Sequence, residues 1–347
     1  MTFKFPVLEH PCIHLLPRNA SVWGMRNVVM VMAAINGMAF AGPNPGATRA
    51  FDRYVGITET RISQELASGP FLRIDSLPEA EQWAAQARLQ RGEVLVERLN
   101  TQDQGQPIAV PGGMIHHWVA AVFIPGATLE SALRLVQDYD SQEQFYGPDV
   151  QQSKLIARRG DDFDVFLRFR RSKVITVVLD TEHQVHYGRR DAQHAWSRSV
   201  STRIREVANV GRRGEHELPP EDDHGFLWRL NSYWRFQQAS GGVYVQCEAV
   251  SLTRDIPEGL GWLVRPFVES VPRESLLFTM NATRRALGPG TGKTQSSLHP
   301  PIFPVAPGQL RATVRKINRE GGGKGGVLAG NFVPGDEFCG HRNFSAD

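Results

Sequence analysis

Six segments of alternating apolar and polar residues follow one another between residues 153 and 257, and they limit the possible fold more than any other feature. Short turns bearing Gly, Asp or Ser separate most of them, and the acidic stretch GRRGEHELPPEDDH separates the fourth from the fifth. The segments are SKLIARRG, DFDVFLRFRR, VITVVLDTEHQVHYG, AWSRSVSTRIREVANV, GFLWRLNSYWRFQQAS and GGVYVQCEAVSLTRDIP. Consecutive strands with short connections pair antiparallel, so the sequence predicts a meander.

Helical periodicity on both sides of this run predicts what packs on the sheet. Residues 48–66 and 77–90 form two expected helices, followed by the strand RGEVLVERLN and the polar connection TQDQGQPIAVPGG. The strand MIHHWVAAVFIPG ends at a Pro-Gly pair, and Thr128 is placed to cap the helix of TLESALRLVQDYDSQEQFYG. Helices are expected again over 259–270 and 272–287, with Pro272 in the first turn of the second. The expected class is α+β, with a curved antiparallel sheet against a long C-terminal helix.

The last two strands set a face of large side chains beside a face of small ones. Every second residue of a strand points to the same side. One strand thereby groups Phe226, Trp228, Leu230, Ser232, Trp234 and Phe236, and the next groups Val243, Val245, Cys247, Ala249 and Ser251. Such a pairing can enclose a cavity lined by apolar groups with a few polar anchors. The alternative is that the rings pack against the last helix and fill the space.

The residues expected to line this cavity come from four strands. Arg198 and His183 are its candidate polar anchors, because Arg198 shares a face with Trp196 and His183 lies beside Val185. The full expected lining is Trp228, Leu230, Trp234, Phe236, Val243, Val245, Cys247, Trp196, Arg198 and His183.

Charge and motif spacing exclude several function classes. With 39 basic and 36 acidic residues the net charge is +3, which gives no electrostatic case for nucleic acid. The stretch GPGTGKT resembles a phosphate loop, yet Leu287 stands where the first Gly should be and no strand precedes it, so no nucleotide is expected. The three cysteines are too few and too scattered for a disulfide framework or a metal site.

Metal and acid–base chemistry are not indicated either. His183 and His186 are three apart on a predicted strand, which sends them to opposite faces. Asp180 and Glu182 share a face, but the opposite face is apolar, so both carboxylates are expected to face water. No Gly-x-Ser-x-Gly turn is present. We therefore expect no metal, no cofactor and no assigned catalytic residue.

The N-terminal region predicts export. MRNVVMVMAAINGMAFAGP has a basic start, an apolar middle and a small-residue end before a turn, so residues 25–41 read as a signal peptide with Met25 as a possible true start. The 13-residue apolar run 28–40 is shorter than the roughly 20 residues of a membrane span, so none is expected in the mature chain. The alternative is a buried helix in a cytoplasmic protein. The expected location is periplasmic or extracellular.

The order of elements resembles the START-like, polyketide-cyclase-like (SRPBCC) superfamily, over residues 114–287. HHWVAAVFIPG, VLDTEHQVHYG and CEAVSLTRDIPEGLGWLVRPFVESVPRESL look like an exported bacterial branch of unassigned function. The resemblance implies a helix-grip fold, with a tunnel that in many members holds a lipid, sterol or aromatic polyketide. It implies no reaction, because the superfamily shares no catalytic motif that transfers to numbered positions here.

These expectations divide the chain into four parts. Residues 1–41 are an upstream extension with the signal peptide, 42–110 a helical lead-in, 111–287 the helix-grip domain and 288–347 a Gly- and Pro-rich tail expected to be mostly disordered. The expected function is binding, and in one version transport, of a hydrophobic small molecule or lipid. Two alternatives stay open: a cyclase- or hydratase-type enzyme using His183 or Arg198, and a filled-core interaction domain.

Overall fold

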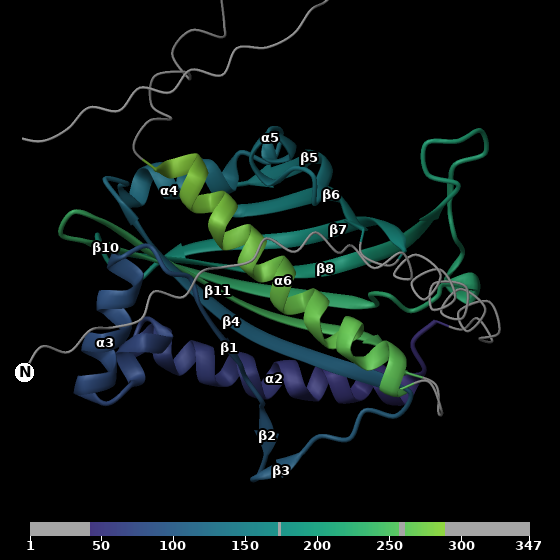
Figure 1. The fold of residues 1–347 in the computed structure, drawn as a ribbon, viewed down its shortest axis with the longest axis horizontal. Coiled ribbons are helices and arrows are strands. Elements are labelled where there is room, and N and C mark those ends of the chain that lie inside the picture. The colour runs from purple at the N-terminus through teal and green to yellow at the C-terminus, as the bar shows by residue number, and fades with distance from the viewer. Residues whose placement is uncertain (1–41, 173–174, 257–260, 289–347) are drawn as a thin grey trace, which may run out of the picture. The chain divides into compact units, whose positions relative to one another are not determined.

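The computed structural model describes residues 42–172, 175–256 and 261–288, and for 261–268 only the helical backbone (Figure 1). The predicted signal peptide and nearly all of the predicted tail lie outside these residues. Within them, no helix is long and apolar enough to cross a membrane.

Among the described residues two α-helices precede the sheet, as the sequence predicts. They are α2 (Pro45–Ser68) and α3 (Glu79–Gln90), with the short 3-10 helix η1 (Arg73–Ser76) between them. Asn44 caps α2, because its side-chain oxygen accepts a hydrogen bond of 2.7 Å from the Ala47 amide, and Pro45 suits the first turn.

A nine-stranded antiparallel sheet forms the centre of the described chain. Its main order is β1-β4-β11-β10-β8-β7-β6-β5, and β9 pairs with β8. Consecutive strands from β5 to β11 are neighbours apart from the short β9, so the predicted meander is confirmed. The strands are β1 (Leu95–Arg98), β4 (Gly113–Pro125), β5 (Val150–Arg159), β6 (Asp162–Ser172), β7 (Thr176–Arg189), β8 (His194–Ala208), β9 (His216–Glu217), β10 (Arg229–Ala239) and β11 (Gly242–Arg254). A separate hairpin pairs β2 (Gln102–Asp103) with β3 (Gln106–Pro107), and η2 (Pro220–Asp222) precedes β10.

Three further helices lie in the described residues: α4 (Leu129–Gln137), α5 (Gln142–Tyr146) and α6 (Gly261–Leu287). Thr128 caps α4 as expected, accepting from the Ser131 amide at 3.1 Å. The expected division of the last helical region is wrong, because α6 continues through Pro272. A proline inside a helix removes one hydrogen bond, and here packing against β4 and β11 accompanies an uninterrupted helix.

The two faces of the sheet carry different layers (Figure 1). Leu276 and Met280 of α6 pack with Val122 and Phe236 on the concave face, whereas Phe51 of α2 packs on the opposite face with other large apolar side chains. The expected α+β helix-grip class, with a curved antiparallel sheet and a C-terminal helix across it, is confirmed.

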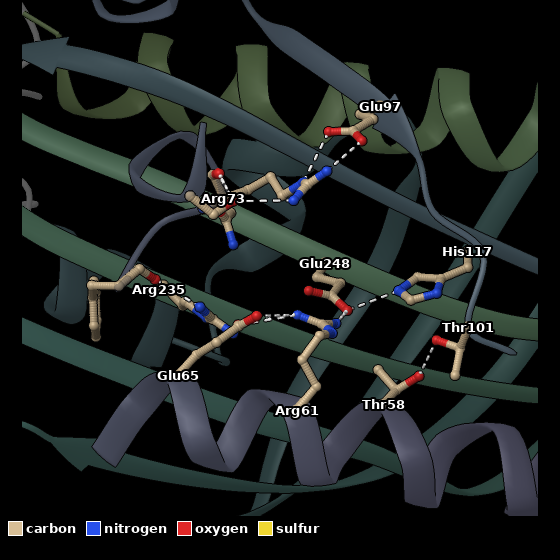
Figure 2. Close-up of polar contacts among 12 residues, drawn as sticks. Thr58, Arg61, Glu65, Arg73, Glu97, Thr101, His117, Arg235 and Glu248 are labelled. Atoms are coloured by element: carbon tan, nitrogen blue, oxygen red, sulfur yellow. Dashed lines mark hydrogen bonds and ion pairs between the residues drawn. The ribbon is translucent and has the colours of Figure 1, made fainter. Parts of the chain in front are cut away.

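Buried charges join α2 to the sheet (Figure 2). Glu248 and His117 are each 2% exposed, and His117 Nε2 lies 2.8 Å from a Glu248 carboxylate oxygen that also pairs with Arg61. An ionised Glu248 carboxylate can only accept, so His117 Nε2 donates to it. The Tyr54 hydroxyl accepts from the Thr101 amide at 2.7 Å and lies 2.9 Å from His117 Nδ1.

The same layer contains a second buried ion pair. Arg235 is 2% exposed, and its Nη2 lies 2.5 Å from a Glu65 oxygen while its Nη1 donates to the Phe71 carbonyl at 2.7 Å. Burial opposes ionisation of Glu248, but the hydrogen bond from His117 and the Arg61 charge lower its pKa below the ordinary 4.5. The buried charges of Glu248 and Arg235 on the α2 side of the sheet are therefore paired.

Replacing the central carboxylate should destabilise the protein. Glu248→Gln leaves His117 without an anionic partner and Arg61 with Glu65 alone, and we expect the free energy of unfolding to fall by about 2–4 kcal/mol in urea titrations. Glu97→Gln breaks the solvent-exposed ion pair with Arg73. This variant should change the free energy of unfolding by less than about 0.5 kcal/mol. Equal losses in the two variants would contradict the role given to the buried cluster.

The same pair of variants gives a pH test. Because the folded pKa of Glu248 is lowered, its contribution is full above the ordinary 4.5 and is lost as the pH falls through the folded value. The stability difference between the natural protein and Glu248→Gln should shrink in that acidic range. A difference that does not change with pH would contradict an ionised Glu248.

Candidate ligand-binding cavity

A cavity of about 510 Å³ lies between the concave face of the sheet and α6. This volume is within the range of about 300–1,000 Å³ typical of small-molecule pockets. Its wall is mainly apolar and includes Val177, Leu179, Leu230, Trp234, Leu276 and Phe278. The small-residue face of β11 is therefore not completely covered by side chains.

Side-chain size along β10 and β11 explains where the hollow lies. At one end of the pair Phe236 faces Val245, both fully buried, in the cluster that also contains Leu133 of α4. Toward the other end the facing pair is Ser232 and Ala249, which line the cavity. Small side chains across from each other leave a volume that α6 covers but does not fill.

Four of the expected lining residues lie on the cavity wall: Leu230, Trp234, Cys247 and His183. Contact with a ligand stays a prediction for each of them. Phe236, Val243 and Val245 share the concave face, but all three are 0% exposed within the filled cluster beside the cavity. The expectation that they line the hollow is therefore wrong, because α4 covers that end of the sheet.

Three further expected residues lie on the α2 side of the sheet. Arg198 Nε lies 2.7 Å from a Glu59 oxygen of α2, so Arg198 is not a cavity anchor. Trp196 covers Gly188, where an added Cβ would lie 2.4 Å from the indole, and its ring centroid is 5.5 Å from that of His186. Trp228 packs in the α2-side cluster. It precedes the first residue of β10, so the alternation of that strand does not apply to it.

Several wall residues were not anticipated. Leu167 and Phe169 of β6 and Ser197 and Ser199 of β8 line the cavity. Alternation in β6 contains a usable signal, because Phe163, Val165, Leu167 and Phe169 share one face. In β8 small polar residues occupy the concave face, and Trp196 lies on the opposite face. The hydrophobicity of the side chains therefore predicts the wrong face of this strand for the cavity wall.

His183 is an uncharged polar group on the wall. It is 4% exposed, and burial lowers its pKa to about 4. The Thr181 hydroxyl donates to the Leu167 carbonyl at 2.8 Å, so it accepts from His183 Nε2 at 3.0 Å. Nδ1 then carries the lone pair, with Ser199 Oγ at 3.5 Å. His186 points away and pairs with Asp162, which confirms that the two histidines occupy opposite faces.

Two tyrosines form the polar part of the wall near α4. The Tyr187 hydroxyl donates to the Val136 carbonyl at 3.2 Å, so the Tyr139 hydroxyl donates to Tyr187 at 2.7 Å. Burial raises the pKa of both phenols, and they stay protonated at neutral pH. These hydroxyls already have partners and add no charge to the cavity.

Other candidate chemistry is not supported. Burial raises the pKa of the Cys247 thiol, which makes it a poor nucleophile. Asp180 does not face water as expected, because it is 5% exposed and accepts hydrogen bonds of 2.6 and 2.8 Å from Arg168 on the α2 side. Within the described ranges, no group of three or more His, Cys, Asp or Glu residues could hold a metal ion.

Neither a protein-family model nor a curated protein matches this sequence. Solved structures similar to it include TTHA0849 from Thermus thermophilus, with 16% identity, a TM-score of 0.36 and coverage of 49% of this chain and 94% of that one. A STAR-related lipid transfer protein from Xanthomonas axonopodis shows 17% identity, a TM-score of 0.36 and coverage of 55% and 98%. Zhui aromatase/cyclase from Streptomyces sp. R1128 shows 11% identity, a TM-score of 0.35 and coverage of 50% and 94%. At such scores any function must be argued from this chain's own cavity.

Proposed function

We propose that this protein binds an apolar small molecule, such as a lipid, in the cavity under α6 and catalyses no reaction on it. The observation that carries the proposal is a hollow of about 510 Å³ with a mainly apolar wall. Burial of an apolar molecule there is favourable at roughly 25 cal/mol per Å² of apolar surface removed from water.

The polar groups of the wall support binding over chemistry. His183 is uncharged at neutral pH, and its lowered pKa makes it a weak base. The hydroxyl groups of Tyr139 and Tyr187 already donate their protons in hydrogen bonds within the protein. These groups can tolerate or orient a ligand without driving proton transfer.

An enzyme of the cyclase or hydratase type is the second candidate. Its specific support is the lone pair at His183 Nδ1, which could accept a hydrogen bond or a proton from a substrate hydroxyl or enol. Arg198 has no part in it, because that side chain pairs with Glu59 on the other face. The third candidate, a filled core acting through protein contacts, does not agree with the cavity.

Export to the periplasm or the exterior is part of the proposal, based on residues 25–41 of the sequence alone. N-terminal sequencing of the mature protein should find a chain that begins just after residue 41. A chain that begins near Met1 and remains inside the cell would contradict export.

Filling the hollow should abolish binding. Ala249→Phe places a ring inside the cavity, and we expect the affinity for the apolar dye Nile red to fall at least about tenfold in fluorescence titrations. Ala67→Phe adds the same ring to the exposed face of α2 and should leave the affinity unchanged. Native mass spectrometry of the gently purified natural protein should also show a retained apolar molecule.

The outcome that contradicts the proposal is equally specific. If Nile red binds the two variants and the natural protein alike, the dye is not in the cavity. Circular dichroism of Ala249→Phe separates a blocked cavity from a lost fold.

A further inference from the structure

A patch of serine hydroxyls lies on the sheet side of the cavity. Ser197 and Ser199 of β8, Ser232 of β10 and Ser251 of β11 all line it. Ser232 stands directly opposite Ser199 in the sheet, and Ser197 and Ser251 are its diagonal neighbours on the two adjacent strands. We refer to these four residues as the serine patch.

Three of the four hydroxyls are unpaired within the part of the chain that the structure describes. Ser197 is 3% exposed and Ser251 is 7% exposed, so both side chains are almost completely buried. The hydroxyls of Ser197, Ser232 and Ser251 make no hydrogen bond to a described residue, yet each keeps surface that is accessible from the cavity. A buried hydroxyl without a partner is unfavourable. The partner must therefore be a molecule in the cavity, either water or a ligand.

The hydroxyls of α6 on the opposite wall already have partners. Thr279 Oγ1 donates to the Ser275 carbonyl at 2.9 Å, and the Ser275 hydroxyl accepts from Arg171 Nε at 2.8 Å. The other α6 side chains on the wall are apolar, as Leu276 and Phe278 are. The unpaired hydroxyls therefore lie on the sheet and face an apolar helix.

Apolar surface borders the serine patch along the strand. Leu230 and Trp234 precede and follow Ser232 on the same face of β10, and both line the cavity. An oxygen atom that binds at Ser232 must therefore belong to the middle of a ligand, with apolar parts that extend in both directions.

His183 adds an acceptor beside the serine patch. Its Nε2 donates to the Thr181 hydroxyl, so Nδ1 carries a lone pair, and the Ser199 hydroxyl at 3.5 Å is too far away for a strong hydrogen bond. The serine patch and His183 together supply hydrogen-bond donors and an acceptor. Among oxygen groups a hydroxyl uses both, whereas a carbonyl only accepts.

We propose that the serine patch and His183 bind a hydroxyl group in the middle of an otherwise apolar ligand. The ligand class is a compact apolar alcohol whose hydrocarbon parts lie toward Leu230 and Trp234. This inference rests on the proposed binding function and adds to it the chemistry of the ligand's sheet-facing side.

Three probes with the same rigid ring system test the proposal: fluorene, fluorenone and fluorenol, which carry no oxygen, a carbonyl and a hydroxyl at the central carbon. Each is measured by displacement of Nile red. A purely apolar cavity binds them in the order in which they leave water, with fluorene tightest and fluorenol weakest. The serine patch and His183 should invert the order of the two oxygenated probes, so that the natural protein binds fluorenol more tightly than fluorenone.

Serine variants give the decisive comparison. Ser232→Ala should weaken fluorenol binding at least about fivefold and leave the fluorene affinity within about twofold, since only the alcohol loses a hydrogen bond. Unchanged fluorene binding also shows that the cavity is intact. Ser63→Ala, which removes an exposed hydroxyl of α2, should keep the natural affinities. Ser251→Ala repeats the test within the serine patch and replaces Ser232→Ala if that variant does not fold.

Two results would overturn the proposal. One is a fluorenol affinity that is unchanged in both Ser232→Ala and Ser251→Ala, which leaves water as the partner of these hydroxyls. The other is natural protein that binds fluorenone more tightly than fluorenol. If neither Nile red nor fluorene binds the natural protein, the cavity function itself fails, which differs from fluorene binding with no effect of the serine substitutions.

Discussion

The two-residue period of β11 is the constraint on which the rest of the structure depends. Its odd-numbered side chains face α6 and the cavity, whereas its even-numbered ones face the layer of α2, η1 and α3, so one strand belongs to two different layers. Cys247 lies on the cavity wall, while the next residue, Glu248, lies in the buried charge cluster against α2 (Figure 2). A shift of one residue would exchange these faces and place a carboxylate in an apolar hollow.

The filled face explains how the other face can stay hollow. Side chains that line a void lose packing contacts on that side. Interactions elsewhere must therefore hold the wall in place. On the α2 side, the hydrogen bond between His117 and Tyr54 and the ion pair between Arg235 and Glu65 hold the sheet against the helix. At the α4 end, Phe236 and Val245 close the core. The hollow is thus bordered by tightly packed regions, and an apolar ligand would restore the missing contacts.

Much of the fold could be predicted from sequence, because alternation and short turns determine a meander locally. The concave face of β7 was also predictable, since Val177, Leu179 and His183 alternate cleanly. The face of β8 was not, because Arg198 and Trp196 gain their partners from distant elements, Glu59 and Gly188.

The central claim is that the space between the sheet and α6 is empty of side chains and accessible to apolar molecules. Crystals of the protein exposed to xenon under pressure test it directly, because xenon enters apolar cavities of this kind. The account predicts bound xenon between Leu230 and Trp234 on the sheet and Leu276 on α6. Side chains occupying that volume, with no xenon in it, would contradict the account.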